Sequence, residues 1–179
     1  VLKPGATSDA MMSFVDVLPT FIELAGGQVP ADLDGRSFKR VLLREAQAHR
    51  DHVFASHTRD GQMNIFPQRA VRDGRHKFIL NLNPENKWTT HFTKVMEIPD
   101  SHGEVYATWT AAAQTNAAAA RLVQTIEQHA REEFYDTQAD PFELHNLIAD
   151  PAHRDRIARM REKLAAWMKQ QGDAGTPEP

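Results

Sequence analysis

The sequence predicts an α+β fold: a small antiparallel sheet packed by a C-terminal helix, preceded by the closing helical piece of a larger α/β domain. The stretch QRAVRDGRHKFILNLN indicates the sheet, because two strand-like apolar runs flank Asp73-Gly74. Apolar residues at helical spacing after Pro151 indicate the helix. The chain opens with Val1 rather than Met, and VLKPGATSDA is typical of the interior of a longer sequence, so we expect a fragment.

The first region, from Val1 to about Leu43, is expected to be helical. In FVDVLPTFIELAGG the apolar residues follow the spacing of a helix that is buried along one stripe. Asp16 is the expected N-cap, Pro19 fits the first turn, and Gly26-Gly27 provides a left-handed stop. The stripe comprises Phe14, Val17, Leu18, Phe21, Ile22, Leu24 and Ala25. If the larger domain is missing, an exposed apolar patch around Phe14, Phe21 and Ile22 is expected.

A turn and a second, shorter helix are expected next. VPADLDGRSF predicts a turn at Asp34-Gly35, and Ser37 can cap a short helix that runs through Leu43.

The second region is expected to be β-like. HVFASHT predicts a short strand, and the runs around Asp73-Gly74 predict a hairpin in which Gln68–Val71 pairs antiparallel with Lys77–Leu80. An Asp-Gly pair favours a primed turn, because both central residues of that turn need positive φ.

The third region is expected to be mainly helical. The alanine-rich stretch from Gly103 to Arg131 favours one long helix or two short ones, and FYD predicts a brief strand. After Pro151, an amphipathic helix with a charged outer face is indicated, and the tail GDAGTPEP is expected to fray. The apolar positions of that helix are Ile157, Met160, Leu164, Trp167 and Met168.

These regions predict three parts of the chain. Residues 1–43 are expected to end a large α/β domain, residues 44–173 to form a C-terminal α+β subdomain, and residues 174–179 to be a disordered tail.

Composition excludes several classes of partner and site. A net charge of -3 provides no basic surface for nucleic acid, and the apolar runs are too short to span a membrane. The chain contains no cysteine, so it has no disulfide, zinc-thiolate site or thiol nucleophile. The absence of cysteine does not indicate the cellular compartment of the protein.

The segment PFELHNLIADP, Pro141 to Pro151, could be a binding loop or a connector. Asp140 precedes a proline and is therefore pushed out of the α region, which ends an extended segment. Asn146 and Asp150 suit turn and cap positions, and Pro151 suits the first turn of the last helix. We interpret the segment as a connector between a strand and a helix.

Four motifs in this sequence resemble those of the sulfatase family, within the alkaline-phosphatase-like superfamily. FYDTQADPFELHNLIADP resembles the family's C-terminal aromatic-Tyr-Asp segment, and SFVDVLPTFIELAG resembles its Ser-x-Val-Asp-x-x-Pro-Thr helix. LDGRSF resembles its Asp-Gly-x-Ser turn, and RAVRDGRHKFILN its Arg-x-Val-Arg hairpin. VFASHTRDGQMNIFPQRAVRDGRHKFILNLN further resembles the sulfamidase branch, the N-sulfoglucosamine sulfohydrolases.

The resemblance implies a parent enzyme that hydrolyses sulfate esters or sulfamates, with a sulfated sugar as substrate. It also implies a formylglycine made within a Cys/Ser-x-Pro-x-Arg motif and a calcium ion, both upstream of the Val-Asp-x-x-Pro-Thr helix. The motif does not occur in this chain, which also lacks a credible nucleophile with an electrostatic clamp. We therefore expect the chain alone to be inactive, its partner to be the missing N-terminal catalytic domain, and its own cofactors to be none. A secreted or periplasmic parent is compatible with the resemblance.

Other constellations of residues point less clearly to a site. His49 and His52 are three apart, but a strand is expected to begin near Val53 and no carboxylate has a recognised zinc spacing. A Ser-His-Asp triad through Ser37 or Ser56 can be imagined in any chain of this size. The basic set of the hairpin could hold an anion or form ion pairs on a solvated face; it comprises Arg69, Arg72, Arg75, His76 and Lys77.

The loop SHTRDGQMNIFP, Ser56 to Pro67, is the candidate recognition site. It is polar, contains glycine and is too long for a tight turn, and loops on a sheet edge concentrate recognition residues. In the sulfamidase-like proteins that this region resembles, the corresponding loop faces the catalytic pocket. The resemblance thus implies that His57 and Arg59 contact an anionic sugar; the alternative is a mobile surface loop.

Two other functions stay open from the sequence. One is a related phosphatase or phosphodiesterase of the same superfamily, and the other is a non-catalytic module that binds a partner through the first helix.

Overall fold

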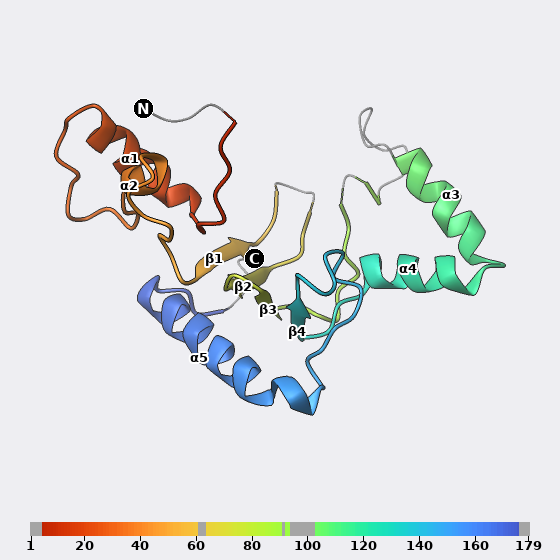
Figure 1. Ribbon diagram of the computed structural model, residues 1–179. Coiled ribbons are helices and arrows are strands. Elements are labelled where there is room, and N and C mark those ends of the chain that lie inside the picture. Colours follow the sequence, from red (N-terminus) through yellow and green to blue (C-terminus); the bar gives the residue numbers. More distant parts are fainter. Residues whose placement is uncertain (1–4, 61–63, 91, 94–102, 176–179) are drawn as a thin grey trace. The chain divides into compact units, whose positions relative to one another are not determined.

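A computed structural model describes residues 5–60, 64–90, 92–93 and 103–175 (Figure 1). The chain forms two compact units, one of Val1–Phe54 with Arg72–Gly74 and one of Ala55–Val71 with Arg75–Pro179. The expected domain boundaries at 43 and 173 stay a prediction, and residues 176–179 of the expected tail lie outside the described residues. In chain order the elements are η1 (Phe14–Asp16), α1 (Val17–Leu24), α2 (Lys39–Leu42), β1 (Val53–His57), β2 (Gln68–Arg72), β3 (His76–Asn81), α3 (Gly103–Ala113), α4 (Ala117–Glu127), β4 (Glu132–Asp136), η2 (Pro151–His153) and α5 (Arg154–Gln170).

The strands form one antiparallel sheet in the order β1-β2-β3-β4, which confirms the predicted α+β class. β3 and β4 pair with Phe78 opposite Phe134 and with Ile79 opposite Glu133. Because side chains alternate along a strand, Phe78 and Phe134 share one face of the sheet while Ile79 and Glu133 share the other.

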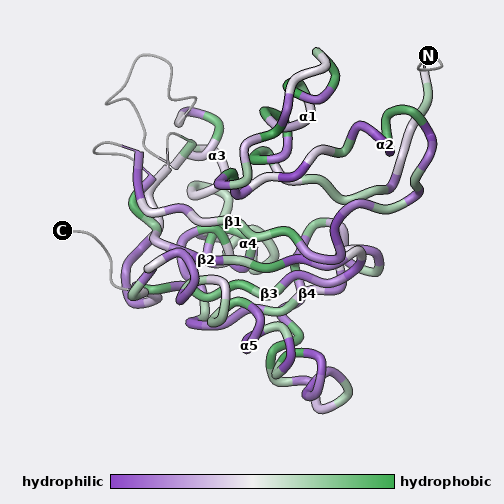
Figure 2. The backbone as a smooth tube through the Cα atoms, turned by 90° about the vertical axis from the view of Figure 1, so that its left-hand side faces the viewer, coloured by the Kyte–Doolittle hydropathy of each residue, from purple (hydrophilic) through white to green (hydrophobic). Residues whose placement is uncertain are grey.

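The C-terminal helix α5 lies along the face that carries Phe78 and Phe134 (Figure 1). Figure 2 shows that hydrophilic and hydrophobic residues alternate along this helix, as expected for an amphipathic one. The guanidinium of Arg161 lies 5.6 Å from the centre of the Phe78 ring and its Nε donates to Glu132 (2.7 Å). Four of the five predicted apolar positions are buried, namely Ile157, Met160, Leu164 and Met168, while Trp167 is half-buried.

The hairpin was predicted correctly, but its turn was not. β2 ends at Arg72 and β3 begins at His76, so three residues connect the strands. Neither Asp73 nor Gly74 has a positive φ, and the predicted primed turn is therefore wrong. The reason is length: a connection of three residues does not require the left-handed pair that a two-residue primed turn needs.

The segment after β4 is a connector, as interpreted from the sequence. The side chain of Asn146 accepts a hydrogen bond from the Phe134 N–H (3.0 Å), and the Leu147 N–H donates to the Phe134 carbonyl (2.8 Å). Asp150 caps η2 by accepting from the Ala152 N–H (2.8 Å). These bonds satisfy the backbone of edge strand β4 and start the last helix, which explains the acids and the amide of the segment.

In the first unit, the buried carboxylate of Asp16 is a hub of hydrogen bonds. Its carboxylate accepts from the backbone N–H groups of Ser13 (2.9 Å) and Arg36 (3.0 Å) and pairs with the Arg50 guanidinium. His49 Nε2 lies 3.2 Å from the same carboxylate. Asp16 is the N-cap residue of α1, as predicted, but its side chain makes no cap hydrogen bond to that helix, because its oxygens bind Ser13, Arg36 and Arg50 instead.

Thr20, the threonine of the Val-Asp-x-x-Pro-Thr motif, links α1 to the Asp-Gly-x-Ser turn. The buried hydroxyl of Thr20 donates to the Asp16 carbonyl (2.6 Å) and accepts from the Phe38 N–H (3.0 Å). Ser37 accepts from the Lys39 N–H (3.2 Å) just before α2, but the predicted cap is wrong, because the N-cap residue of this helix is Phe38. Gly26 takes the predicted left-handed conformation (φ +79°) where α1 ends.

Most of the apolar stripe of η1 and α1 is exposed, as predicted around Phe14 and Phe21 for a chain without the larger domain. Phe14 is 91% exposed and Phe21 is 64% exposed. The buried residues of α1 are instead Pro19 and Thr20, on the side where Asp16 and Thr20 bind the turn. Polar hydrogen bonds therefore decide which side of this helix faces its own unit.

Gly35 provides a test of this packing. A Cβ atom added at Gly35 would lie 1.8 Å from the Val15 carbonyl oxygen, a backbone atom that has no side-chain freedom with which to yield. We expect Gly35→Ala to lower the free energy of unfolding by at least about 2 kcal/mol, measured by urea denaturation. The matched control is Gly74→Ala, where a Cβ meets nothing within 4 Å and φ is not positive. An equal effect of the two substitutions would contradict the close approach of Gly35 to the Val15 carbonyl.

None of the helices within the described residues is long and apolar enough to cross a membrane.

Candidate functional site

His57 is the last residue of β1 and begins the candidate loop. Its Nε2 lies 2.7 Å from the Asn64 carbonyl oxygen, and because a carbonyl only accepts, Nε2 carries the hydrogen. The imidazole ring stacks on the Phe66 ring with 4.2 Å between centroids. His57 thus clamps the two ends of the loop together, while residues 61–63 lie outside the described residues.

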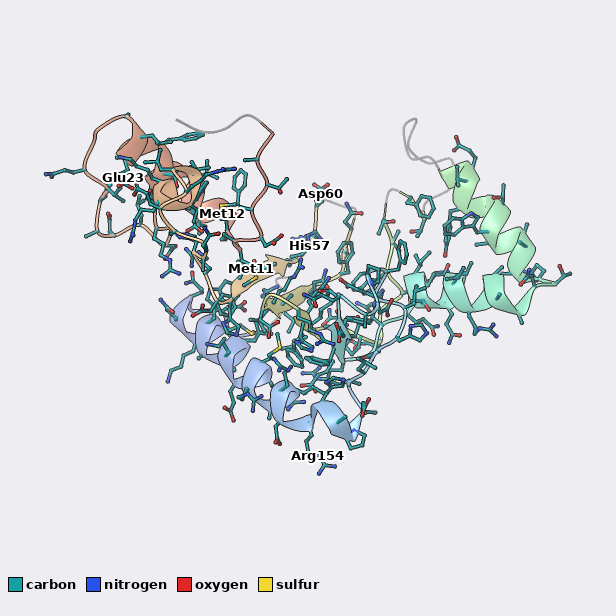
Figure 3. All side chains as sticks on the ribbon, viewed as in Figure 1. Met11, Met12, Glu23, His57, Asp60 and Arg154 are labelled. Atoms are coloured by element: carbon teal, nitrogen blue, oxygen red, sulfur yellow. The ribbon has the colours of Figure 1, made fainter. Side chains whose placement is uncertain are left out.

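Arg59 lies two residues beyond β1 and its side chain is exposed, as is that of Asp60. Figure 3 shows His57 and Asp60 where the chain leaves the sheet. The structure places both predicted residues where the loop leaves β1. Their role in binding stays a prediction.

An aromatic column continues from His57 through the unit. We use this name for the stacked rings of His57, Phe66, Trp88 and His129. Phe66 and Trp88 stack with 4.4 Å between centroids, and Trp88 and His129 with 3.5 Å. The column therefore connects the candidate loop to the chain segment just before β4.

The column ends on a buried carboxylate. His129 Nδ1 donates to Glu133 Oε1 (2.9 Å), and the same oxygen accepts from the Asn81 side chain (2.8 Å). The Tyr135 hydroxyl donates to Glu133 Oε2 (2.8 Å). Burial raises the pKa of Glu133, but the hydrogen bonds from His129 and Tyr135 outweigh it, so the net pKa is lowered. Burial and the neighbouring Glu133 charge raise the pKa of Tyr135, which keeps its hydroxyl a donor.

A polar cavity of about 420 Å³ lies beside this carboxylate. Its wall includes His129, Glu133, Tyr135 and Asn146. The polar atoms of Glu133 and Asn146 already bind protein groups, so the geometry indicates a structural network more than a catalytic one.

Three members of the basic set of the hairpin form ion pairs, which was one of the two open interpretations. Arg69 is buried, pairs with Asp173, and donates to the His57 carbonyl (2.9 Å). Arg75 Nε donates to Asp136 (2.9 Å), and Lys77 pairs with Glu143. Arg69 therefore fixes the strand from which the candidate loop leaves.

The described residues contain no group of three or more His, Cys, Asp or Glu side chains that could hold a metal ion. His49 is instead held at Asp16.

An apolar groove of about 480 Å³ lies in the first unit along the exposed stripe. It is lined by Phe14, Val15, Leu18 and Phe21, together with Leu33 of the following turn. A surface with several exposed large apolar side chains in one place commonly marks an interaction site.

The sequence did not indicate Phe66, Trp88, His129 or Glu133 as members of one arrangement. They come from four separate segments, and stacking between rings leaves no spacing pattern along a chain. The one available signal was composition: aromatic residues and histidines in loops that flank predicted strands.

Comparisons with known proteins identify the family of this chain. Residues 1–128 match the family described as N-sulphoglucosamine sulphohydrolase, C-terminal. An ulvan-active sulfatase of Formosa agariphila is 34% identical over 175 residues, which are 97% of this chain and 32% of that protein. An N-acetylglucosamine-6-O-sulfatase of Bacteroides thetaiotaomicron is 44% identical over 176 residues, covering 96% of this chain and 24% of that protein.

A solved structure of a protein in complex with its substrate D-glucosamine-2-N,6-O-disulfate has the same fold, with a TM-score of 0.64 at 22% identity. The match covers 98% of this chain and 27% of that one. This chain thus spans about a quarter to a third of the length of the relatives it matches. With 128 of its 179 residues matched, the chain belongs to the family of N-sulphoglucosamine sulphohydrolase C-terminal domains.

Proposed function

We propose that this chain is the C-terminal part of an enzyme that hydrolyses sulfate esters or sulfamates on a sugar. The observation that carries the proposal is the family match over residues 1–128, which is supported by relatives named as sulfatases along nearly the whole chain. The residues present do not fit the cofactors that the family implies. The chain has no cysteine and no Cys/Ser-x-Pro-x-Arg motif for a formylglycine, and no metal cluster occurs among its described residues.

The exposed apolar groove supports the existence of a larger partner domain. The stripe of α1 follows a helical pattern typical of burial, yet its own unit leaves Phe14 and Phe21 exposed. Because the chain spans only 24% to 32% of two related sulfatases, we propose that the remaining part of such an enzyme covers this groove. That part would supply the nucleophile and the calcium ion.

The proposed role of this chain in the reaction is to position groups at the substrate. The loop from Ser56 to Pro67 is held at both ends by His57, which leaves Arg59 exposed. An exposed guanidinium on such a clamped loop can donate charge-assisted hydrogen bonds to a sulfate or carboxylate of an anionic sugar.

A substrate-class assay on the complete gene product tests the proposal. The protein is incubated in parallel with an O-sulfated sugar, an N-sulfated sugar and a sugar phosphate, and free sulfate and phosphate are measured. Release of sulfate from either sulfated sugar supports the proposal. Release of phosphate alone would replace it with the phosphatase function, and release of neither would favour a non-catalytic interaction module.

Arg59→Ala is expected to lower kcat/KM for a sulfated sugar by roughly tenfold to a hundredfold, because one charge-assisted hydrogen bond contributes roughly 1.5–3 kcal/mol. The loss should be smaller for a small aryl sulfate, which does not extend to the loop. The matched control is Arg159→Ala, an exposed arginine on α5. Equal losses on the two substrates, or none on either, would show that Arg59 does not select the substrate.

A further inference from the structure

We infer that Trp88 is a positioning residue for the recognition loop, because the aromatic column holds both ends of that loop through stacked rings. The inference rests on the proposed function for the role of the loop in substrate recognition. The role of Trp88 in holding the loop rests on the ring contacts themselves. Three ring contacts and the hydrogen bonds that hold the column carry it.

The loop begins and ends in the column. His57 closes β1, and Phe66 lies just before β2, only nine positions further along the sequence. Their rings stack at an interplanar angle of 23°, and the His57 ring also donates to the Asn64 carbonyl. Anything that fixes the Phe66 ring therefore fixes His57 and, two residues on, Arg59.

Trp88 is the side chain that fixes Phe66. It comes from the segment after β3 and covers the Phe66 ring at an interplanar angle of 19°. The backbone of Trp88 is itself held, since its N–H donates to the Glu127 carbonyl at the end of α4 (2.9 Å). Both ring faces of Trp88 are occupied, one by Phe66 and the other by His129.

His129 anchors the far end of the column on β4. Glu133 is 4% exposed and only accepts hydrogen bonds when ionised, so the His129 Nδ1 that lies 2.9 Å away carries the hydrogen. Asn81 and Tyr135 hold the Glu133 carboxylate from β3 and β4. The column thus connects a rigid, hydrogen-bonded point of the sheet to the loop through three ring contacts.

The arrangement explains why an exposed loop can present Arg59 in a defined place. A side chain on an untethered loop loses conformational freedom when it binds, which weakens binding. Stacked rings hold His57 and Phe66, at the two described ends of the loop, before the substrate arrives. Loss of Trp88 leaves the Phe66 ring without its supporting face and is expected to free the loop without unfolding the sheet.

The test uses three variants of the complete protein. Trp88→Leu removes the aromatic ring, and Trp88→Phe keeps an aromatic ring at this position. Trp109→Leu is the matched control, because Trp109 on α3 contacts Phe92 outside the column. Hydrogen–deuterium exchange of the peptide 56–67 reports on the loop. We expect Trp88→Leu to speed this exchange roughly tenfold, since two stacked contacts are lost. Trp88→Phe and Trp109→Leu should stay close to wild type.

Steady-state kinetics separate the positioning role of Trp88 from the recognition role of the loop. If exchange rises and KM for a sulfated sugar rises with kcat little changed, both the positioning role and the recognition role are supported. If exchange rises while the kinetics on sulfated sugar and aryl sulfate change equally, Trp88 positions the loop but the loop does not select the substrate. If exchange of the peptide does not rise in Trp88→Leu, or rises as much in Trp109→Leu, the inference is overturned.

Discussion

Replacing Asp16 by alanine is expected to destabilise the first unit by about 3–5 kcal/mol, the range for removing one partner of a buried ion pair. Asp16 has no exposed surface, and its loss leaves the Arg50 guanidinium and the N–H groups of Ser13 and Arg36 without their acceptor. The measurement is the free energy of unfolding from urea denaturation at neutral pH. Asp32→Ala, at an exposed position, is the matched control. If the two variants unfold alike, the hub does not stabilise the fold.

The same carboxylate predicts a dependence of stability on pH. Burial raises the pKa of Asp16, but the hydrogen bonds from Arg50 and from the backbone of Arg36 and Ser13 lower it overall, well below the ordinary value of 3.8. A pKa that is lowered on folding stabilises the folded state above the ordinary value, and this stability is lost as pH falls toward the folded pKa. The difference between wild type and Asp16→Asn should therefore be constant near neutral pH and shrink below pH 3.8. A difference in the free energy of unfolding that grows in acid would contradict the stabilising role of the Asp16 carboxylate.

Phe134→Ala is expected to lower the free energy of unfolding by about 3–5 kcal/mol, because it empties a fully buried ring site in the core. Phe134 has no exposed surface, faces Phe78 across β3 and β4, and stacks against His76 with 5.4 Å between centroids. Phe142→Ala, at a ring that is 81% exposed, is the control and should cost little. Similar costs for the two rings would mean that the face under α5 is not the main core.

Periodic elements could be predicted from the sequence because the signal lies within each element. The alternation in β2 and β3 and the spacing of Ile157, Met160 and Leu164 in α5 each describe which side of one element faces apolar surroundings. The alanine-rich region resolves into α3 and α4, one of the two alternatives expected, with Asn116 capping the second helix.

The rest could not be predicted because it depends on contacts between distant segments. Asp16 has the residue type and place of an N-cap, yet its partners lie 20 and 34 positions away at Arg36 and Arg50. The apolar stripe of α1 has the pattern of a buried helix, but a pattern does not say which part of a protein provides the cover. The column through Trp88 is invisible for the same reason, since three-dimensional stacking sets no sequence spacing.

The most direct test of the account measures free sulfate released from an N-sulfated or 6-O-sulfated glucosamine by two samples at equal concentration. One sample is the complete gene product, and the other is this 179-residue chain alone. The account predicts release by the complete protein and none above the blank by the chain, because the chain lacks the motif for the nucleophile. Turnover by the chain alone at the rate of the complete protein would contradict it, as would a complete protein that releases no sulfate.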